Sequence, residues 1–180
     1  MRADLTRAVL TRLEKHTPEW VRSLEIQLLS DLTARAFQVP GRSLWNKPAE
    51  LALRQYAAFT VSCMDEREAD PNVLYREAYA VGSRLRQLTG ISEKRDAERL
   101  VFYLYRNIGI TMLGELPGEI TVPDCFFARF YTPRQCAVMS AVDAGIIAGI
   151  CGGGSLRFSQ RITEGCGMCR ASFIEGRNQV

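Results

Sequence analysis

The sequence predicts an α+β fold in which an N-terminal helical half packs on a small antiparallel sheet carrying a C-terminal helix. In residues 1–108, apolar side chains recur at helical spacing in five segments. Residues 109–174 instead contain short runs typical of strands, separated by turns rich in Gly and Pro. Within this second part, residues 132–151 have the features of one further helix.

Residues that start or stop helices bound the five segments of the helical half. Thr17-Pro18 separates the first two segments, and Asp70-Pro71 is a good start for the fourth, which Gly90 ends. The loop after the second segment holds Trp45, for which we expect a place in the core. The predicted helices cover residues 3–15, 19–37, 48–64, 71–90 and 92–108.

The C-terminal part predicts a sheet of four or five antiparallel strands. Ile110–Gly114 and Glu119–Val122 are short β-prone runs on either side of a Pro-Gly turn, and Cys125–Phe130 is a third extended, aromatic run. Leu156–Ile162 alternates apolar and polar residues with period two, and Met168–Ile174 follows after a Gly-containing turn. These last two segments are expected to pair as a hairpin.

The predicted helix over residues 132–151 carries the most distinctive polar pattern in the chain. Thr132 is a good N-cap, Pro133 fits the first helical position, and three consecutive glycines end the helix. Cys136, Ser140 and Asp143 have the spacing i, i+4, i+7, which places them on one face of an otherwise apolar helix. We therefore take these three residues as the candidate catalytic group.

Length and charge favour a single domain, residues 1–180, with a small-molecule partner. A net charge of +3, with basic residues dispersed among acids, argues against nucleic acid. The first twenty residues are charged throughout, and no apolar run suggests a signal peptide or a membrane span, so we expect a cytoplasmic protein without a membrane partner. A homo-oligomer and a hetero-oligomer both stay open.

An unpaired carboxylate among apolar neighbours is costly, so Asp143 needs a partner. Two alternatives stay open: an ion pair with Arg157 or Arg161 that fixes helix to sheet, or a carboxylate acting on a substrate. A nucleophilic role for Cys136 or Ser140 is weaker, because no nearby histidine supplies a base. The chain's single histidine lies in the first helical pair.

Cys166 and Cys169 form a CxxC motif in a Gly-containing turn, and Cys125 and Cys136 could complete four ligands for zinc or an iron–sulfur cluster. A redox dithiol and plain buried thiols are the alternatives. The expected state is one without a cofactor. Six cysteines in a chain without secretory features do not indicate a disulfide framework.

The C-terminal pattern resembles the L-2-amino-thiazoline-4-carboxylic acid hydrolase family. The residues that carry this resemblance are Asp143, Arg161-Ile162-Thr163, Gly165, Cys169 and Phe173. The resemblance implies a hydrolase that adds water to a small C=N-containing ring of an amino-acid-derived substrate. In that case Asp143 would activate water or protonate the ring nitrogen.

The same resemblance suggests residues that bind the substrate. Arg161 or Arg157 would hold its carboxylate, Tyr131 or Ser140 would orient the ring, and Cys169 would lie beside it. Ser140 stands where the family commonly has a cysteine. A non-catalytic partner subunit of an enzyme in secondary metabolism is therefore a further alternative.

A looser similarity points to a different class, the 4-vinyl reductase domain. The helix from Gly145 to Gly149, followed by Glu164, Cys166 and Cys169, is similar to the pattern of that module. This resemblance implies a sensor that binds a small ligand or a metal through the C-terminal cysteines.

Overall fold

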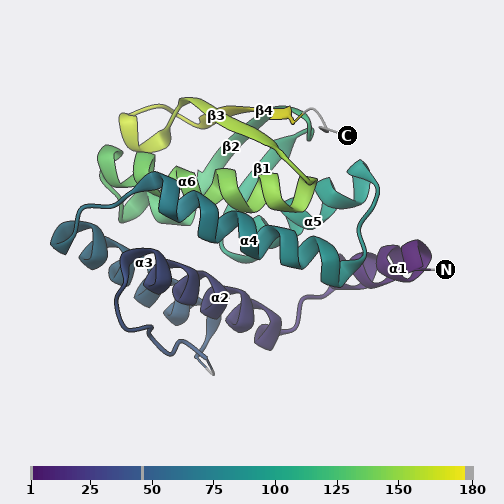
Figure 1. Ribbon diagram of the computed structural model, residues 1–180, viewed down its shortest axis with the longest axis horizontal. Coiled ribbons are helices and arrows are strands. Elements are labelled where there is room, and N and C mark those ends of the chain that lie inside the picture. The colour runs from purple at the N-terminus through teal and green to yellow at the C-terminus, as the bar shows by residue number, and fades with distance from the viewer. Residues whose placement is uncertain (1, 46, 177–180) are drawn as a thin grey trace.

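The computed structural model describes residues 2–45 and 47–176 and confirms the predicted α+β class. Six α-helices and four strands are formed within this part of the chain (Figure 1). The helices are α1 (Arg2–Lys15), α2 (Glu19–Phe37), α3 (Ala49–Glu66), α4 (Pro71–Thr89), α5 (Lys94–Asn107) and α6 (Pro133–Cys151). The strands are β1 (Ile110–Gly114), β2 (Gly118–Cys125), β3 (Gly154–Gln160) and β4 (Cys169–Glu175), with short 3₁₀ helices η1 (Phe126–Arg129) and η2 (Ile162–Glu164).

The capping residues act as the sequence predicts. Asp70 accepts a hydrogen bond from the backbone N–H of Asn72 at the start of α4, and Gly90 ends that helix in the left-handed conformation. At the start of α6, Thr132 and Gln135 form a reciprocal capping box. These local signals explain why the helix boundaries lie within a few residues of the predicted ones.

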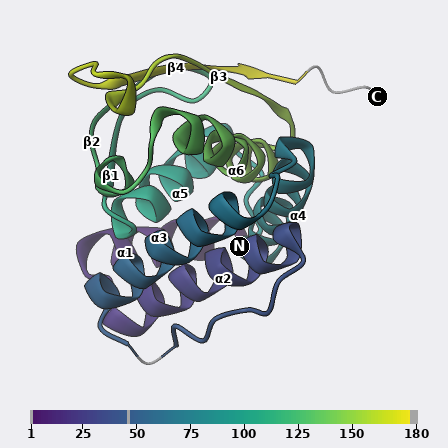
Figure 2. The same cartoon turned by 90° about the vertical axis from the view of Figure 1, so that its left-hand side faces the viewer.

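The four strands form one antiparallel sheet in the order β1-β2-β4-β3. The predicted hairpin of the last two strands is present, with Leu156 opposite Phe173 and Phe158 opposite Ala171. One face of the sheet packs on α5 and α6, while α2 and α3 form a further helical layer below them (Figure 2). The core therefore runs between the sheet and the helical half.

Helix α4 packs closely against α6 through glycines on both helices. A Cβ atom at Gly145 would lie 2.4 Å from the carbonyl oxygen of Tyr75, and one at Gly149 would lie 2.5 Å from that of Tyr79. Gly82 of α4 faces Ile146 in the same way, at 2.4 Å. Since real Cβ atoms do not approach backbone so closely, these glycines set the distance between the helices.

Two expectations are wrong. The run Cys125–Phe130 is not a strand: β2 ends at Cys125, and η1 follows because Phe126 and Phe127 turn into the core, where their rings meet edge to face. Trp45 is not a core residue, since 44% of it is exposed. Leu44, its neighbour, is buried in its place.

The expectation of no membrane span needs one qualification. Among the described residues, α6 is long and apolar enough to cross a membrane by length and composition alone. Half of its apolar window is buried inside the protein. The core helix of a soluble protein has the same properties, so the observation is weak evidence for a membrane.

Candidate functional site

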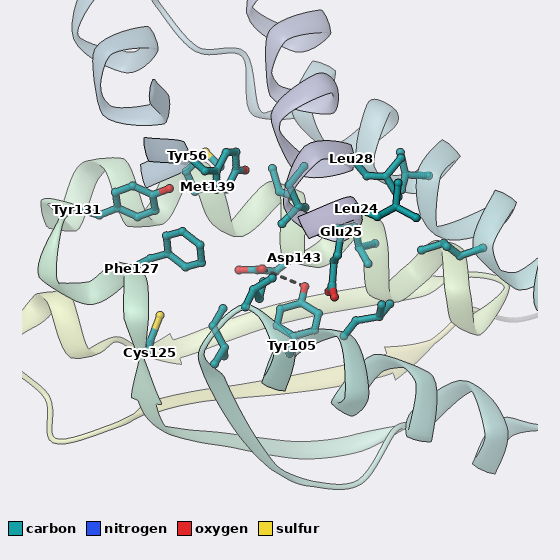
Figure 3. A pocket seen from close by; sticks show the side chains of 18 of the residues that line it. Leu24, Glu25, Leu28, Tyr56, Tyr105, Cys125, Phe127, Tyr131, Met139 and Asp143 are labelled. Carbon is teal, nitrogen blue, oxygen red and sulfur yellow. Dashed lines mark hydrogen bonds between the residues drawn. The ribbon is translucent and has the colours of Figure 1, made fainter. Parts of the chain in front are cut away.

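A cavity of about 210 Å³ lies among α2, α4, α5, α6 and η1, on the helical side of the sheet (Figure 3). Leu24 and Leu28 line it and are also exposed on α2, so the cavity reaches the surface there. Its other apolar lining residues are Val21, Leu29, Val81, Leu85, Leu104, Ile108, Ile110, Phe127, Met139, Val142 and Ile146. Its polar lining residues are Glu25, Tyr56, Tyr105, Cys125, Tyr131, Cys136 and Asp143.

Asp143 projects from α6 into the middle of this cavity. The Tyr105 hydroxyl donates a hydrogen bond of 2.9 Å to Oδ1 of Asp143 (Figure 3). Burial raises the pKa of Asp143 to about 7, although the bond from Tyr105 and the positive charge of Arg161 partly oppose that rise. The carboxyl group can therefore both give and take a proton near neutral pH.

Glu25 supplies a second carboxyl group to the same cavity, from α2. Its Oε2 accepts a hydrogen bond of 3.1 Å from Nδ2 of Asn107. Burial raises the pKa of Glu25 to about 8, against the lowering effects of Asn107 and Arg22. Figure 3 shows the Tyr105 hydroxyl between the Glu25 and Asp143 carboxyl groups. Burial, with a further contribution from both acids, raises the pKa of Tyr105.

Aromatic rings form one end of the cavity. Phe127 meets Tyr56 edge to face at 5.8 Å and stacks on Tyr131 at 5.6 Å. The two phenol groups have hydrogen-bond partners outside the lining: Tyr56 with Thr33 at 3.1 Å, and Tyr131 with Thr60 at 2.7 Å. Tyr131, a predicted substrate-binding residue, therefore presents mainly its ring to the cavity.

The predicted catalytic group is only partly brought together at the cavity. Asp143 and Cys136 line it, whereas Ser140 does not. The Ser140 hydroxyl donates to the backbone carbonyl of Cys136 at 2.8 Å and accepts from Nε of Arg161 at 3.4 Å. Burial raises the pKa of Cys136, which disfavours its thiolate form.

Neither predicted arginine lines the cavity. Arg157 is exposed on β3, and Arg161 pairs with Glu164 at 3.3 Å in the segment that follows that strand. No ion pair between Asp143 and an arginine is seen among the described residues, where the hydrogen-bond partner of this acid is Tyr105. The proposed ion pair between helix and sheet is thus not found in this part of the chain.

The cysteines that were candidate metal ligands do not form a ligand group. Within residues 2–45 and 47–176, no three or more His, Cys, Asp or Glu side chains are placed to hold a metal ion. Cys125 lines the cavity, and burial raises its pKa to about 12. Cys169 is buried outside the lining, where its sulfur accepts the N–H of Ile162 at 3.4 Å, and Cys166 is partly exposed.

Three polar residues of the cavity, Glu25, Tyr56 and Tyr105, are absent from the sequence-based candidates. Tyr56 and Tyr105 lie in the third and fifth predicted helical segments, where no local pattern distinguishes them from ordinary packed tyrosines. Glu25 carries a clearer signal, because it shares a helical face with Val21 at i−4 and Leu28 at i+3. A carboxylate inside such an apolar stripe is costly to bury unless it has a partner or a functional role, as for Asp143.

No family model matches the chain, and no curated protein is significantly similar to it.

Proposed function

We propose that the protein is a hydrolase-like enzyme that uses Asp143 as general acid and base to open a small C=N-containing ring. The observation that carries this proposal is a carboxyl group with a pKa of about 7, hydrogen-bonded to Tyr105 and facing a cavity with a mostly apolar lining. Perturbed carboxyl groups in such cavities are typical of acid–base sites. The resemblance to the aminothiazoline carboxylate hydrolase family supports the same reaction class.

The reaction can be written with balanced atoms and protons. Asp143 first gives its proton to the ring nitrogen, which makes the C=N carbon electrophilic. The oxygen of a water molecule bonds to this carbon, and a proton of that water passes to the Asp143 carboxylate. As the ring C–N bond breaks, the hydroxyl on the carbon becomes a carbonyl: Asp143 gives a proton to the leaving nitrogen, which departs as an amine, and takes up the hydroxyl proton. The product is the substrate plus one water, and Asp143 is protonated again.

The environment of Asp143 suits these proton transfers. Tyr105 fixes one carboxyl oxygen, and the apolar lining limits competing solvent. The thiol of Cys136 is a poor nucleophile here because burial raises its pKa, so water is the preferred attacking group. An acid–base group of this kind typically contributes ~10²–10⁴-fold to the rate.

The cavity gives no support to a substrate carboxylate held by arginine. Arg157 is exposed, and Arg161 is engaged by Glu164 and lies outside the lining. The substrate we propose is therefore a compact cyclic amidine or imine without a required carboxylate. A cavity of about 150 Å³ holds a benzene-sized molecule, so about 210 Å³ accommodates one substituted five- or six-membered ring.

The test is ring opening of 2-amino-2-thiazoline and of its 4-carboxylic acid, followed by chromatography. We expect turnover of the first compound, and a loss of at least about 100-fold on Asp143→Asn, because the amide cannot exchange the proton. Asp124→Asn, an exposed acid on β2, is the matched control and should keep full activity. Unchanged turnover in Asp143→Asn would refute the proposed role.

A second candidate is a small-ligand-binding module without catalysis. It is favoured by the lining itself, in which apolar and aromatic side chains outnumber polar ones. In that case small apolar rings should bind to the wild type and to Asp143→Asn, and neither protein should convert them.

A further inference from the structure

Among the carboxyl, amino, guanidinium and imidazole groups that could carry charge in the cavity, only carboxyl groups are present in the described part of the chain. Its lining contains the two acids Glu25 and Asp143, and no Lys, Arg or His within residues 2–45 and 47–176. An anionic ligand would face two carboxyl groups with no compensating cation. Burial raises the pKa of both acids, to about 8 for Glu25 and about 7 for Asp143, so a ligand cation beside them would favour their ionised forms and pair with them.

The nearest guanidinium groups do not neutralise these acids. Arg22 lowers the pKa of Glu25, but this effect is smaller than the rise caused by burial. The Arg22 guanidinium forms an ion pair of 3.8 Å with Glu19 and donates a hydrogen bond of 3.2 Å to the backbone carbonyl of Asn107. Arg161 is likewise paired with Glu164. Both cations are thus engaged outside the cavity.

The aromatic end offers a second feature suited to a cation. The rings of Tyr56, Phe127 and Tyr131 lie next to one another on the lining. The faces of such rings attract organic cations. Figure 3 shows these rings on one side of Asp143 and Glu25 on the other, so a planar cation could contact both.

We propose that Glu25 makes the cavity selective for a basic ligand held as its cation, an amidinium or a small organic ammonium, whose charge is balanced by Glu25 and Asp143. This inference rests on the proposed function in so far as the ring substrate is the ligand. In the proposed reaction this cation forms when Asp143 protonates the ring nitrogen. Asp143 transfers the proton, and Glu25 balances the positive charge that results.

The experiment compares three ligands of nearly the same shape by isothermal titration calorimetry at neutral pH. Benzamidinium carries a positive charge, benzamide is neutral, and benzoate is negative. We expect benzamidinium to bind at least about tenfold more tightly than benzamide, since a buried charge partner contributes well over one order of magnitude. Benzoate should not bind measurably.

The variant Glu25→Gln tests the assignment of this selectivity. It should reduce benzamidinium affinity by about tenfold or more while leaving benzamide affinity unchanged, because only the charged ligand uses the carboxylate. Glu50→Gln, at an exposed acid of α3, is the matched control and should bind all three ligands as the wild type does. Unchanged benzamide affinity also shows that the variant is folded.

Three results would overturn the inference: equal affinity for benzamidinium and benzamide, no binding of benzamidinium at millimolar concentration, or full selectivity in Glu25→Gln. These results are separable from failure of the proposed function. Charge selectivity without turnover of an aminothiazoline refutes the enzyme alone. Turnover that depends on Asp143 without charge selectivity refutes the role of Glu25 alone.

Discussion

Asp143 and Tyr105 form the pair on which the chemistry depends. The phenol donates to the carboxylate at 2.9 Å, and this bond stabilises the charged form of the acid. Burial has the opposite and larger effect, so the pKa remains at about 7. Their balance keeps Asp143 available for proton transfer near neutral pH.

Tyr105→Phe should therefore raise the pKa of Asp143 above its wild-type value, because the lost donor favoured the carboxylate. The measurement is a carboxyl-carbon NMR titration with labelled aspartate. Tyr103→Phe is the matched control on the same helix, since the Tyr103 hydroxyl is buried without a hydrogen-bond partner in the described part of the chain. A pKa that stays constant in Tyr105→Phe, or falls, would contradict this balance.

The sequence predicts Asp143 well because a carboxylate stands out on an apolar helix. It does not predict the partner of Asp143, because Tyr105 lies 38 positions away on another helix. A tyrosine on a buried face usually only packs, so nothing local marks it as a donor. The arginines are predicted partners because of their charge, their shared face on the predicted strand and, for Arg161, the family resemblance, but Arg157 lies on the exposed side of the hairpin.

Among the elements, α6 determines the position of the site. Its capping box fixes where the helix begins, and its glycines allow α4 to approach closely. The period of apolar residues predicts most helices and both hairpin strands, because local spacing follows local structure. The aromatic run that follows β2 is an exception: it is predicted as a strand but forms η1, because burial of Phe126 and Phe127 outweighs their preference for strands.

Gly145→Ala should destabilise the protein by about 1–3 kcal/mol, because the new methyl group would clash with two atoms of α4, the backbone oxygen of Tyr75 and the Cβ atom of Ala78. Urea unfolding followed by circular dichroism measures the loss. Gly167→Ala is the control, as a Cβ there meets no atom within 4 Å. Equal midpoints for wild type and Gly145→Ala would show that α4 and α6 do not depend on this contact.

At the scale of the molecule, the cavity lies where the helices of residues 1–108 meet α6 and the residues around β1 and β2. Side chains from α2, α3, α4, α5, α6, β1, β2 and η1 line it. A ligand bound there would contact both halves and would stabilise the folded state by mass action. The spacing of apolar residues along the chain does not show which distant helices come into contact. The sequence therefore predicts the helical and sheet layers but neither the cavity nor the presence of Glu25 in its lining.

The same burial links Asp143 to the stability of the whole fold. Its pKa rises from 3.8 to about 7 on folding, so the folded state holds a proton that the unfolded state releases. The associated stability is present below about pH 4 and is lost as the pH rises toward 7. With 1.36 kcal/mol per pKa unit, the loss is about 4 kcal/mol.

The most direct measurement is the free energy of unfolding of wild type and Asp143→Asn in urea between pH 4 and pH 8. Asparagine mimics the protonated acid at every pH, and the titration of Glu25 contributes to both proteins and cancels in the difference. We predict that wild type loses stability relative to Asp143→Asn as the pH rises, by up to about 4 kcal/mol. Curves that stay parallel from pH 4 to pH 8 would show that Asp143 is already ionised at pH 4, as an ordinary aspartate is, and would contradict the account.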